Sequence, residues 1–191
     1  RVRDPKRTRR KILEASYREF YRHGFQGGSI NRIVAAAGIT KGALFHHFSG
    51  KNDLGYSVLD ELMIPAIQNW WVEPLEKGDD PLGSLREILD RFLKKIEGEV
   101  AETGFLFNGS PICNFAVEMS PLDEGFRERL CSIYKIWSNS ISSALKRGQE
   151  KSVVRPDITP SDEASFLVAI MEGSASIGKV DRNIHFLRSC I

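Results

Sequence analysis

The chain has 191 residues, of which 41% are hydrophobic and 27% charged, which fits a folded domain and excludes collagen-like, disordered and disulfide-rich chains. No apolar run reaches the roughly 18 residues that a membrane-spanning helix needs, so no membrane partner is expected. Three cysteines at Cys113, Cys131 and Cys190 match neither a disulfide framework nor a zinc site. The first two are interpreted as buried, inert thiols, and the compartment as cytoplasmic.

The net charge of +2 conceals an uneven distribution along the chain. Residues 1–51 hold 12 Lys and Arg against three acids, a charge of +9, whereas residues 52–191 carry −7. A basic segment followed by an acidic remainder is typical of a polyanion-binding part joined to a second part. Because seven of the 12 positive residues lie within residues 1–11, a flexible basic arm explains the charge equally well.

Four helices are predicted in the first third of the chain. Apolar side chains at helical spacing predict a helix from Lys6 to His23 and a second, capped by Ser29, through Ala37. Thr40 caps a third helix, which extends to His47. A fourth begins near Lys51 and is expected to be kinked or stopped at Pro65.

The later helices are predicted from their capping signals. Ser84 is expected to cap one helix, and Ser120, followed by Pro121, is expected to cap the next. Thr159 is expected to cap a helix that runs to about Lys179, and a last helix follows from Asn183. The chain is therefore expected to be all-α, with about nine helices and no sheet.

Two short helices joined by a glycine-containing turn, within residues 29–51, match a helix-turn-helix. In that motif the second helix lies in the major groove of DNA while the first contacts the phosphate backbone. Leu44 and Phe48 are expected to face inward and hold the second helix on the first. The predicted DNA-binding residues are Ser29, Arg32, Thr40, Lys41, Gly42, Ala43, Phe45, His46, His47 and Lys51.

The first 55 or so residues resemble the TetR-type transcriptional repressors. The resemblance lies in the helix over residues 8–20, the segment 33–39 and the run 40–48, followed by Lys51 and Leu54. One departure is Phe45, where this family usually carries Tyr, so this position lacks the hydroxyl that would hydrogen-bond to a phosphate. The resemblance implies an N-terminal helix-turn-helix domain, residues 1–51, and a helical effector-binding and dimerisation domain, residues 52–191. It also implies a homodimer that represses transcription at a palindromic operator and is released by a small effector.

Aromatic and sulfur-containing side chains in the second domain are candidates for the lining of a largely apolar effector pocket, although any one such residue is more often part of a simple core. The segment from Phe105 to Asn114 is the preferred cavity wall. The candidate pocket residues are Trp70, Phe92, Phe105, Phe107, Cys113, Phe115, Met119, Trp137 and Met171. The effector itself is not identified.

The helix over residues 162–179 is apolar around much of its circumference and carries small residues where another helix can approach closely. Without the family resemblance, a buried core helix is the alternative. By resemblance, this helix and the last one form the dimer interface. The predicted interface residues are Phe166, Leu167, Ile170, Gly173, Ser174 and Ile177.

Two other classes of function fit the sequence less well. An enzyme is not favoured, because the sequence contains no nucleophile elbow, dinucleotide or phosphate loop, or zinc-protease motif. No metal or cofactor is expected either, since the adjacent His46 and His47 point about 100° apart on a helix and cannot jointly hold an ion. A non-specific DNA-packaging protein leaves the acidic, aromatic-rich second domain unexplained.

Overall fold

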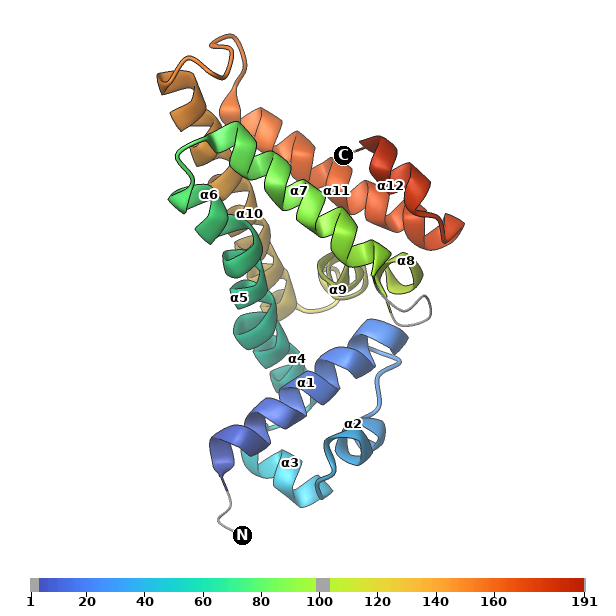
Figure 1. Cartoon of the computed structure of the whole chain (residues 1–191). Helices are drawn as coiled ribbons and strands as arrows, with labels where there is room; N and C mark the ends of the chain where they lie inside the picture. Colours follow the sequence, from blue (N-terminus) through green and yellow to red (C-terminus); the bar gives the residue numbers. More distant parts are fainter. Residues whose placement is uncertain (1–3, 99–103, 191) are drawn as a thin grey trace. The chain divides into compact units, whose positions relative to one another are not determined.

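The computed structural model describes residues 4–98 and 104–190, and the elements in these ranges are all helical, without a strand (Figure 1). The predicted all-α fold is thus confirmed. The chain divides into two compact units: unit 1 joins Arg1–Ile64 with Asn114–Leu130, and unit 2 joins Pro65–Cys113 with Cys131–Ile191. Among the described helices, none combines the length and hydrophobicity needed to cross a bilayer.

Unit 1 begins with the helices that the sequence predicts. They are α1 (Pro5–His23), α2 (Ile30–Ala37), α3 (Lys41–His47), α4 (Lys51–Val58) and the π-helical η1 (Leu59–Met63). Ser29 and Thr40 cap α2 and α3 through their side-chain oxygens, as expected. Between these two helices Gly38 adopts a left-handed conformation, with φ of 65°, that favours glycine.

The core of unit 1 also takes in parts of two later helices, α9 (Pro111–Met119) and α10 (Glu124–Glu150). Phe115 of α9 and Phe126 of α10 are buried. Their rings pack with those of Phe20 and Phe25 at centroid distances between 4.7 and 6.1 Å. Such spacings are typical of aromatic pairs in cores.

Unit 1 extends past the predicted domain boundary at residue 51. Leu54, Val58 and Leu59 are completely buried, which places α4 and the start of η1 in the unit's core. At Gly55 a Cβ atom would lie 2.6 Å from the rings of both Phe25 and Phe126, so only glycine admits these rings. Residues 114–130 cannot be assigned from sequence proximity, because they return to unit 1 about 50 positions after it first ends.

Unit 2 contains the rest of the helices. They are α5 (Ile64–Ile67) from Pro65 onward, η2 (Gln68–Val72), α6 (Glu73–Lys77), α7 (Pro81–Glu97), α8 (Phe105–Asn108), α11 (Pro160–Asp181) and α12 (Ile184–Cys190), with the adjoining parts of α9 and α10. Helix α12 packs on α11 and on α7. The elements from α4 to α6 follow one another without a break, so Pro65 does not stop the helix; π-helical turns lie on either side of α5.

Two predicted caps are wrong by three or four residues. Helix α7 is capped by Asp80, whose carboxylate accepts from the N–H of Leu82, and not by Ser84. Similarly, α10 begins after Asp123, which accepts from the N–H of Phe126, instead of at Ser120. In both cases an acid occupies the position directly before the helix, and a carboxylate is favoured at the positive end of the helix dipole.

Candidate nucleic-acid interface and effector pocket

Helix α3 exposes the side that was predicted to face DNA. Leu44 is completely buried and Phe48 is 2% exposed, which confirms their inward orientation, whereas Phe45 is 48% exposed. Thr40, Lys41, Gly42 and His46 are exposed as well, and Ala43 and His47 are half-buried. Around Gly42 a Cβ atom would meet nothing within 4 Å, so α3 presents an open surface to a partner.

The two predicted residues of α2 are tied to α1. Arg32 donates from Nε to Glu19 at 2.7 Å and from an Nη to the carbonyl of Gly27 at 2.8 Å, and Glu19 also accepts from the N–H of Ser29 at 2.8 Å. Burial acts to raise the pKa of Glu19, but these donors outweigh it and lower the pKa overall. Arg32 therefore braces α2 on α1 while remaining half-exposed.

Lys51 is likewise engaged inside unit 1. Its Nζ donates to the carbonyl oxygen of Gln26 at 2.9 Å and lies 5.0 Å from the centre of the Phe25 ring. Burial lowers the pKa of this ammonium group. The first-turn N–H groups of α4, which no side chain caps, are thus better placed than the Lys51 side chain to bind a phosphate.

Arg9 is a positioning residue that no sequence pattern indicated. Its guanidinium lies 4.3 Å from the centre of the Phe48 ring and donates to the carbonyl oxygen of His47 at 3.1 Å. It also pairs with Glu61 and donates to Ser57 at 3.3 Å. One side chain of α1 thereby binds the last turn of α3 and both segments that follow it. In the sequence, Arg9 cannot be told apart from the other cations of the basic N-terminus.

A segment distant in sequence holds the turn between α1 and α2. The carboxylate of Glu118 in α9 accepts from the N–H groups of Phe25 and Gln26, each at 2.7 Å. Nearby in unit 1, Asp123 accepts from the hydroxyl of Tyr56 at 2.7 Å and from Asn52 at 3.0 Å. Residues 114–130 are therefore joined to the helix-turn-helix by directional bonds as well as by the aromatic core.

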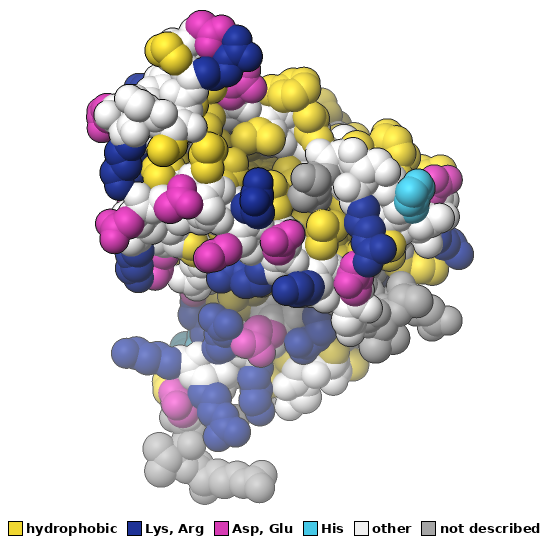
Figure 2. Space-filling view, turned by 45° about the horizontal axis from the view of Figure 1, so that its top comes forward, with side chains coloured by type: hydrophobic (Ala, Val, Ile, Leu, Met, Phe, Trp, Pro, Cys, Tyr) yellow, Lys and Arg dark blue, Asp and Glu magenta, His cyan; other side chains and the backbone are white. Residues whose placement is uncertain are grey.

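The surface of unit 1 is basic. Lys and Arg side chains are dense on the face of this unit that Figure 2 shows, with few acids among them. The charge of +9 lies in residues 1–51, and the other residues of unit 1, 52–64 and 114–130, reduce the charge of the whole unit to +4. Such a surface attracts the phosphate backbone of nucleic acid.

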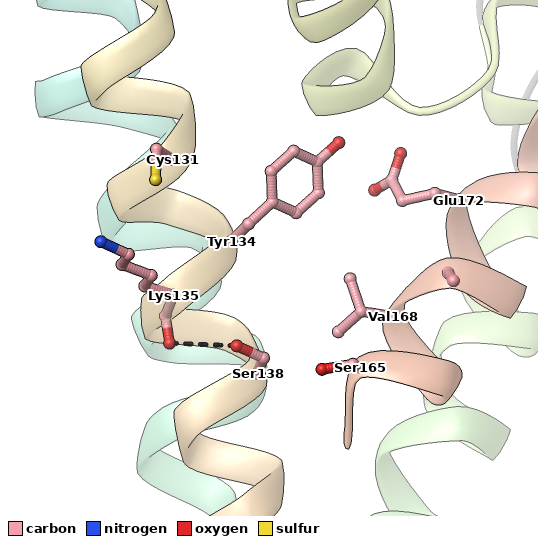
Figure 3. Close-up of a pocket in the computed structure, with 8 residues that line it drawn as sticks. Cys131, Tyr134, Lys135, Ser138, Ser165, Val168 and Glu172 are labelled. Carbon is pink, nitrogen blue, oxygen red and sulfur yellow. Dashed lines mark hydrogen bonds between the residues drawn. The ribbon is translucent and has the colours of Figure 1, made fainter. Parts of the chain in front are cut away.

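Unit 2 contains a pocket of about 480 Å³ between α10 and α11. Figure 3 shows side chains of both helices directed into it. This volume is within the usual range for small-molecule sites. Its lining residues are Cys131, Tyr134, Lys135, Ser138, Ser165, Val168, Ala169 and Glu172.

None of the nine predicted pocket residues is among those lining this pocket. Phe115 and Met119 belong to the core of unit 1. The others lie in unit 2. The ring of Phe92 packs on that of Phe105 with centroids 5.1 Å apart, and the ring of Trp137 packs on that of Trp71 with centroids 5.0 Å apart. Arginine side chains cover the rings of Trp70 and Phe107, and Met171 is buried. Cys113 comes nearest to the pocket, because its N–H donates to the hydroxyl of Ser110 at 3.2 Å, and that hydroxyl donates to Glu172 at 3.0 Å.

The polar residues of the pocket, above all Tyr134 and Glu172, were not predicted from the sequence. A signal was available, since Glu172 is the one acid in the otherwise uncharged run from Ala164 to Gly178. Cys131 was expected to be buried and is exposed, because it lies on the side of α10 that opens toward the pocket. That prediction was wrong.

The predicted interface residues of α11 occupy different environments. Phe166 is 60% exposed, Ile177 is exposed and Gly173 has open space around it, while Leu167 and Ile170 are half-buried. Ser174 faces the interior of unit 2, where its hydroxyl donates to the carbonyl of Met171 at 3.0 Å. Val180, which was not predicted, is 85% exposed.

In residues 4–98 and 104–190, no group of three His, Cys, Asp or Glu side chains is arranged to hold a metal ion. His46 and His47 have their ring centroids 5.4 Å apart and their ring planes inclined at 69°. With no third side chain to complete a site, both remain available for contacts at the surface of α3.

Comparison with known proteins connects these features. Residues 12–55 match the tetR family of bacterial regulatory proteins, and residues 81–189 match the tetracyclin repressor-like C-terminal domain. The transcriptional regulator LmrA of Bacillus subtilis is 30% identical over 190 residues, covering 96% of this chain and 94% of its own. The repressor DhaR of a Mycobacterium species is 29% identical, covering 92% of this chain and 84% of its own.

Solved structures agree in fold. Reduced NemR of E. coli superposes with a TM-score of 0.84 at 21% identity, covering 96% of this chain and 93% of its own. The regulatory protein TetR of Rhodobacter sphaeroides gives a TM-score of 0.84 at 19% identity, with 95% and 93% covered. With its helix-turn-helix, its helical second part and these matches, the chain belongs to the TetR family of DNA-binding transcriptional regulators and is not an enzyme.

Proposed function

We propose that the protein is a cytoplasmic repressor that binds a palindromic operator as a homodimer and leaves it when a small, largely apolar effector binds in unit 2. The observation that carries the proposal is the exposed side of α3, from Thr40 to His47, held in place by buried Leu44 and Phe48. A short helix fixed on its inner side and open on its outer side suits entry into a major groove.

The contacts expected in the groove follow from the exposed side chains. Lys41 and the Thr40 hydroxyl, which already accepts from the N–H of Ala43 at 3.2 Å, can donate to phosphate. Gly42 and Ala43 allow close approach to the base edges, and Phe45 can contact a thymine methyl. His46 and His47 can donate to phosphates or to bases.

Support for a homodimer comes from the outer face of α11. Phe166, Gly173, Ile177 and Val180 are all exposed and lie at spacings of 7, 4 and 3 residues, which places them along one stripe of the helix. An apolar stripe of this kind favours pairing with a second copy around a two-fold axis. Two copies then read half-sites related by the same symmetry, which is why a palindrome is expected.

Effector control requires only that the two forms of the protein differ in affinity for the effector. An effector that binds the non-DNA-binding form more tightly shifts the population toward it by that difference in free energy. The pocket between α10 and α11 is the candidate effector site.

The test is binding to a palindrome from the DNA upstream of the gene, measured by fluorescence anisotropy at salt concentrations from about 50 to about 300 mM. We expect affinity to fall steeply with salt, because each phosphate contact releases counterions, and to exceed that for a scrambled duplex. Binding that ignores both salt and sequence would refute the proposal.

A further inference from the structure

The pocket between α10 and α11 contains a half-buried acid, Glu172, that lacks a counter-ion. Oε1 of Glu172 accepts from the hydroxyl of Ser110 at 3.0 Å. Oε2 is buried and has no hydrogen-bond partner, and among the described residues Glu172 forms no ion pair. A buried carboxylate oxygen without a partner is costly, which points to a missing donor from outside the chain.

The groups that face Glu172 do not neutralise it. Tyr134 extends from α10 with its hydroxyl directed toward Glu172, and Lys135 lines the pocket with its ammonium group pointing away from Glu172 (Figure 3). The Sγ of Cys113 in α9 lies 3.8 Å from the Ser176 hydroxyl, and burial raises the pKa of this thiol, so it stays neutral. Burial also raises the pKa of Tyr134, which keeps the phenol protonated.

The rest of the lining defines the body of a ligand. The side chains of Val168 and Ala169 and the ring of Tyr134 supply apolar contact, and Ser138 and Ser165 add hydroxyl groups. An aromatic face beside a carboxylate is the combination that best accommodates an organic cation. An anion in the same place would meet the charge of Glu172 without a compensating cation directed at it.

We infer that this pocket binds an organic cation, a protonated amine carried on an apolar body, with Glu172 as its counter-charge and Tyr134 against its charged end. The inference deepens the proposed function and rests on it, because it names the chemical class of the effector. The ammonium donates to Oε2 of Glu172, and the apolar body lies along Val168 and Ala169.

A matched pair of probes tests the inference on the full chain. 4-Phenylbutylamine and 4-phenylbutan-1-ol differ in the terminal group, ammonium against hydroxyl, and binding of each is measured by titration calorimetry at about pH 8. We expect the amine to bind at least about tenfold more tightly than the alcohol. At about pH 7 it should also release protons, since binding of a cation favours the ionised carboxylate.

Variants separate the carboxylate from the general shape of the pocket. Glu172→Gln is expected to remove the preference for the amine and the proton release, whereas Glu163→Gln, on the same helix outside the pocket, is expected to keep both. Ser138→Phe narrows the pocket without altering Glu172 and is expected to weaken both probes. Circular dichroism and thermal unfolding check that each variant folds.

Several results would overturn the inference. The first is equal affinity for the two probes, and the second is an amine preference that survives in Glu172→Gln. The third is that neither probe binds, as is expected if a second copy of the protein covers the pocket. Operator binding is measured on the same samples. Loss of operator binding refutes the proposed function, whereas normal operator binding without an amine preference refutes the cation site alone.

Discussion

At the scale of single residues, the position of α3 depends on side chains that do not face DNA. Arg9 holds the carbonyl of His47 and the ring of Phe48, at the C-terminal end of α3. Carbonyl groups in the last turn of a helix lack intrahelical partners, so a guanidinium there both satisfies a bond and complements the helix dipole. The exposed residues of α3 can then meet the groove in a single orientation.

Replacing Arg9 with Ala is therefore expected to lower the free energy of unfolding by about 1–3 kcal/mol, because several charge-assisted hydrogen bonds are lost together. Arg10→Ala removes the same charge from the same helix but breaks only the exposed pair with Glu14, and is expected to cost less than about 0.5 kcal/mol. Urea denaturation measures both. Equal losses of unfolding free energy in Arg9→Ala and Arg10→Ala would show that Arg9 contributes only through its charge.

Glu172 makes stability depend on pH. Burial raises the pKa of its carboxyl from 4.5 to about 7, although the hydrogen bond from Ser110 opposes this effect. Between pH 4.5 and about pH 7 the folded state binds more protons than the unfolded state, so the free energy of unfolding falls as pH rises through this window. Because a tenfold change in proton affinity corresponds to about 1.4 kcal/mol, the loss of stability approaches about 3 kcal/mol above pH 7.

Glu172→Gln lacks this ionisation. We expect the variant to match the unaltered protein at about pH 4 and to be the more stable of the two at about pH 8, by up to about 3 kcal/mol. Denaturant unfolding across this pH range measures the difference, in which contributions from the other acids cancel. A difference that does not change with pH would mean that the carboxyl titrates normally.

At the scale of elements, unit 1 is completed by residues 114–130. Glu118 satisfies two N–H groups in the turn between α1 and α2, where Gly24 has φ of 72°. A Cβ atom at Gly24 would lie 3.0 Å from Oε2 of Glu118, so glycine permits both the turn and the contact. Helices α9 and α10 each have residues in both units, so the chain itself links this contact to unit 2.

Glu118→Ala removes both acceptors and is expected to destabilise unit 1 by about 1–3 kcal/mol. Hydrogen exchange at the amides of Phe25 and Gln26 should become faster, because their bonds are broken. Glu128→Ala, an exposed acid of α10, is the control and should leave exchange at these amides unchanged. Unaltered exchange in Glu118→Ala would rule out the contact.

At the scale of the whole molecule, the proposed dimer depends on the outer face of α11. Phe166→Glu and Val180→Glu each place a charge in the apolar stripe, which must lose its water if two copies pair. Both variants are expected to be monomeric in analytical ultracentrifugation and to bind a palindrome at least about tenfold more weakly. Val153→Glu changes a residue of similar exposure outside α11 and is expected to stay dimeric.

If the Phe166→Glu and Val180→Glu variants remain dimeric, the dimer interface does not lie on this stripe. The remaining predicted interface residues would then need another explanation. Leu167, Ile170 and Ser174 are already at least half-buried within unit 2, so they add little area for a partner.

Local signals in the sequence determined the helix-turn-helix. Caps at Ser29 and Thr40, the glycine turn at Gly38 and the inward Leu44 all depend on residues within a few positions of one another, so they can be read without the fold. The all-helical class and the division of charge along the chain are equally properties of the sequence. The family resemblance rested on the same short stretch.

Only the tertiary structure decided which distant residues meet. Phe115 became core of unit 1 and not pocket, Arg9 was distinguished from its basic neighbours, and the apolar residues of α11 were divided between inside and outside. The pocket and its unpaired acid, Glu172, were also found only there. Helical spacing gives the angle of a side chain around its own helix, but packing of the other helices decides which angles are covered.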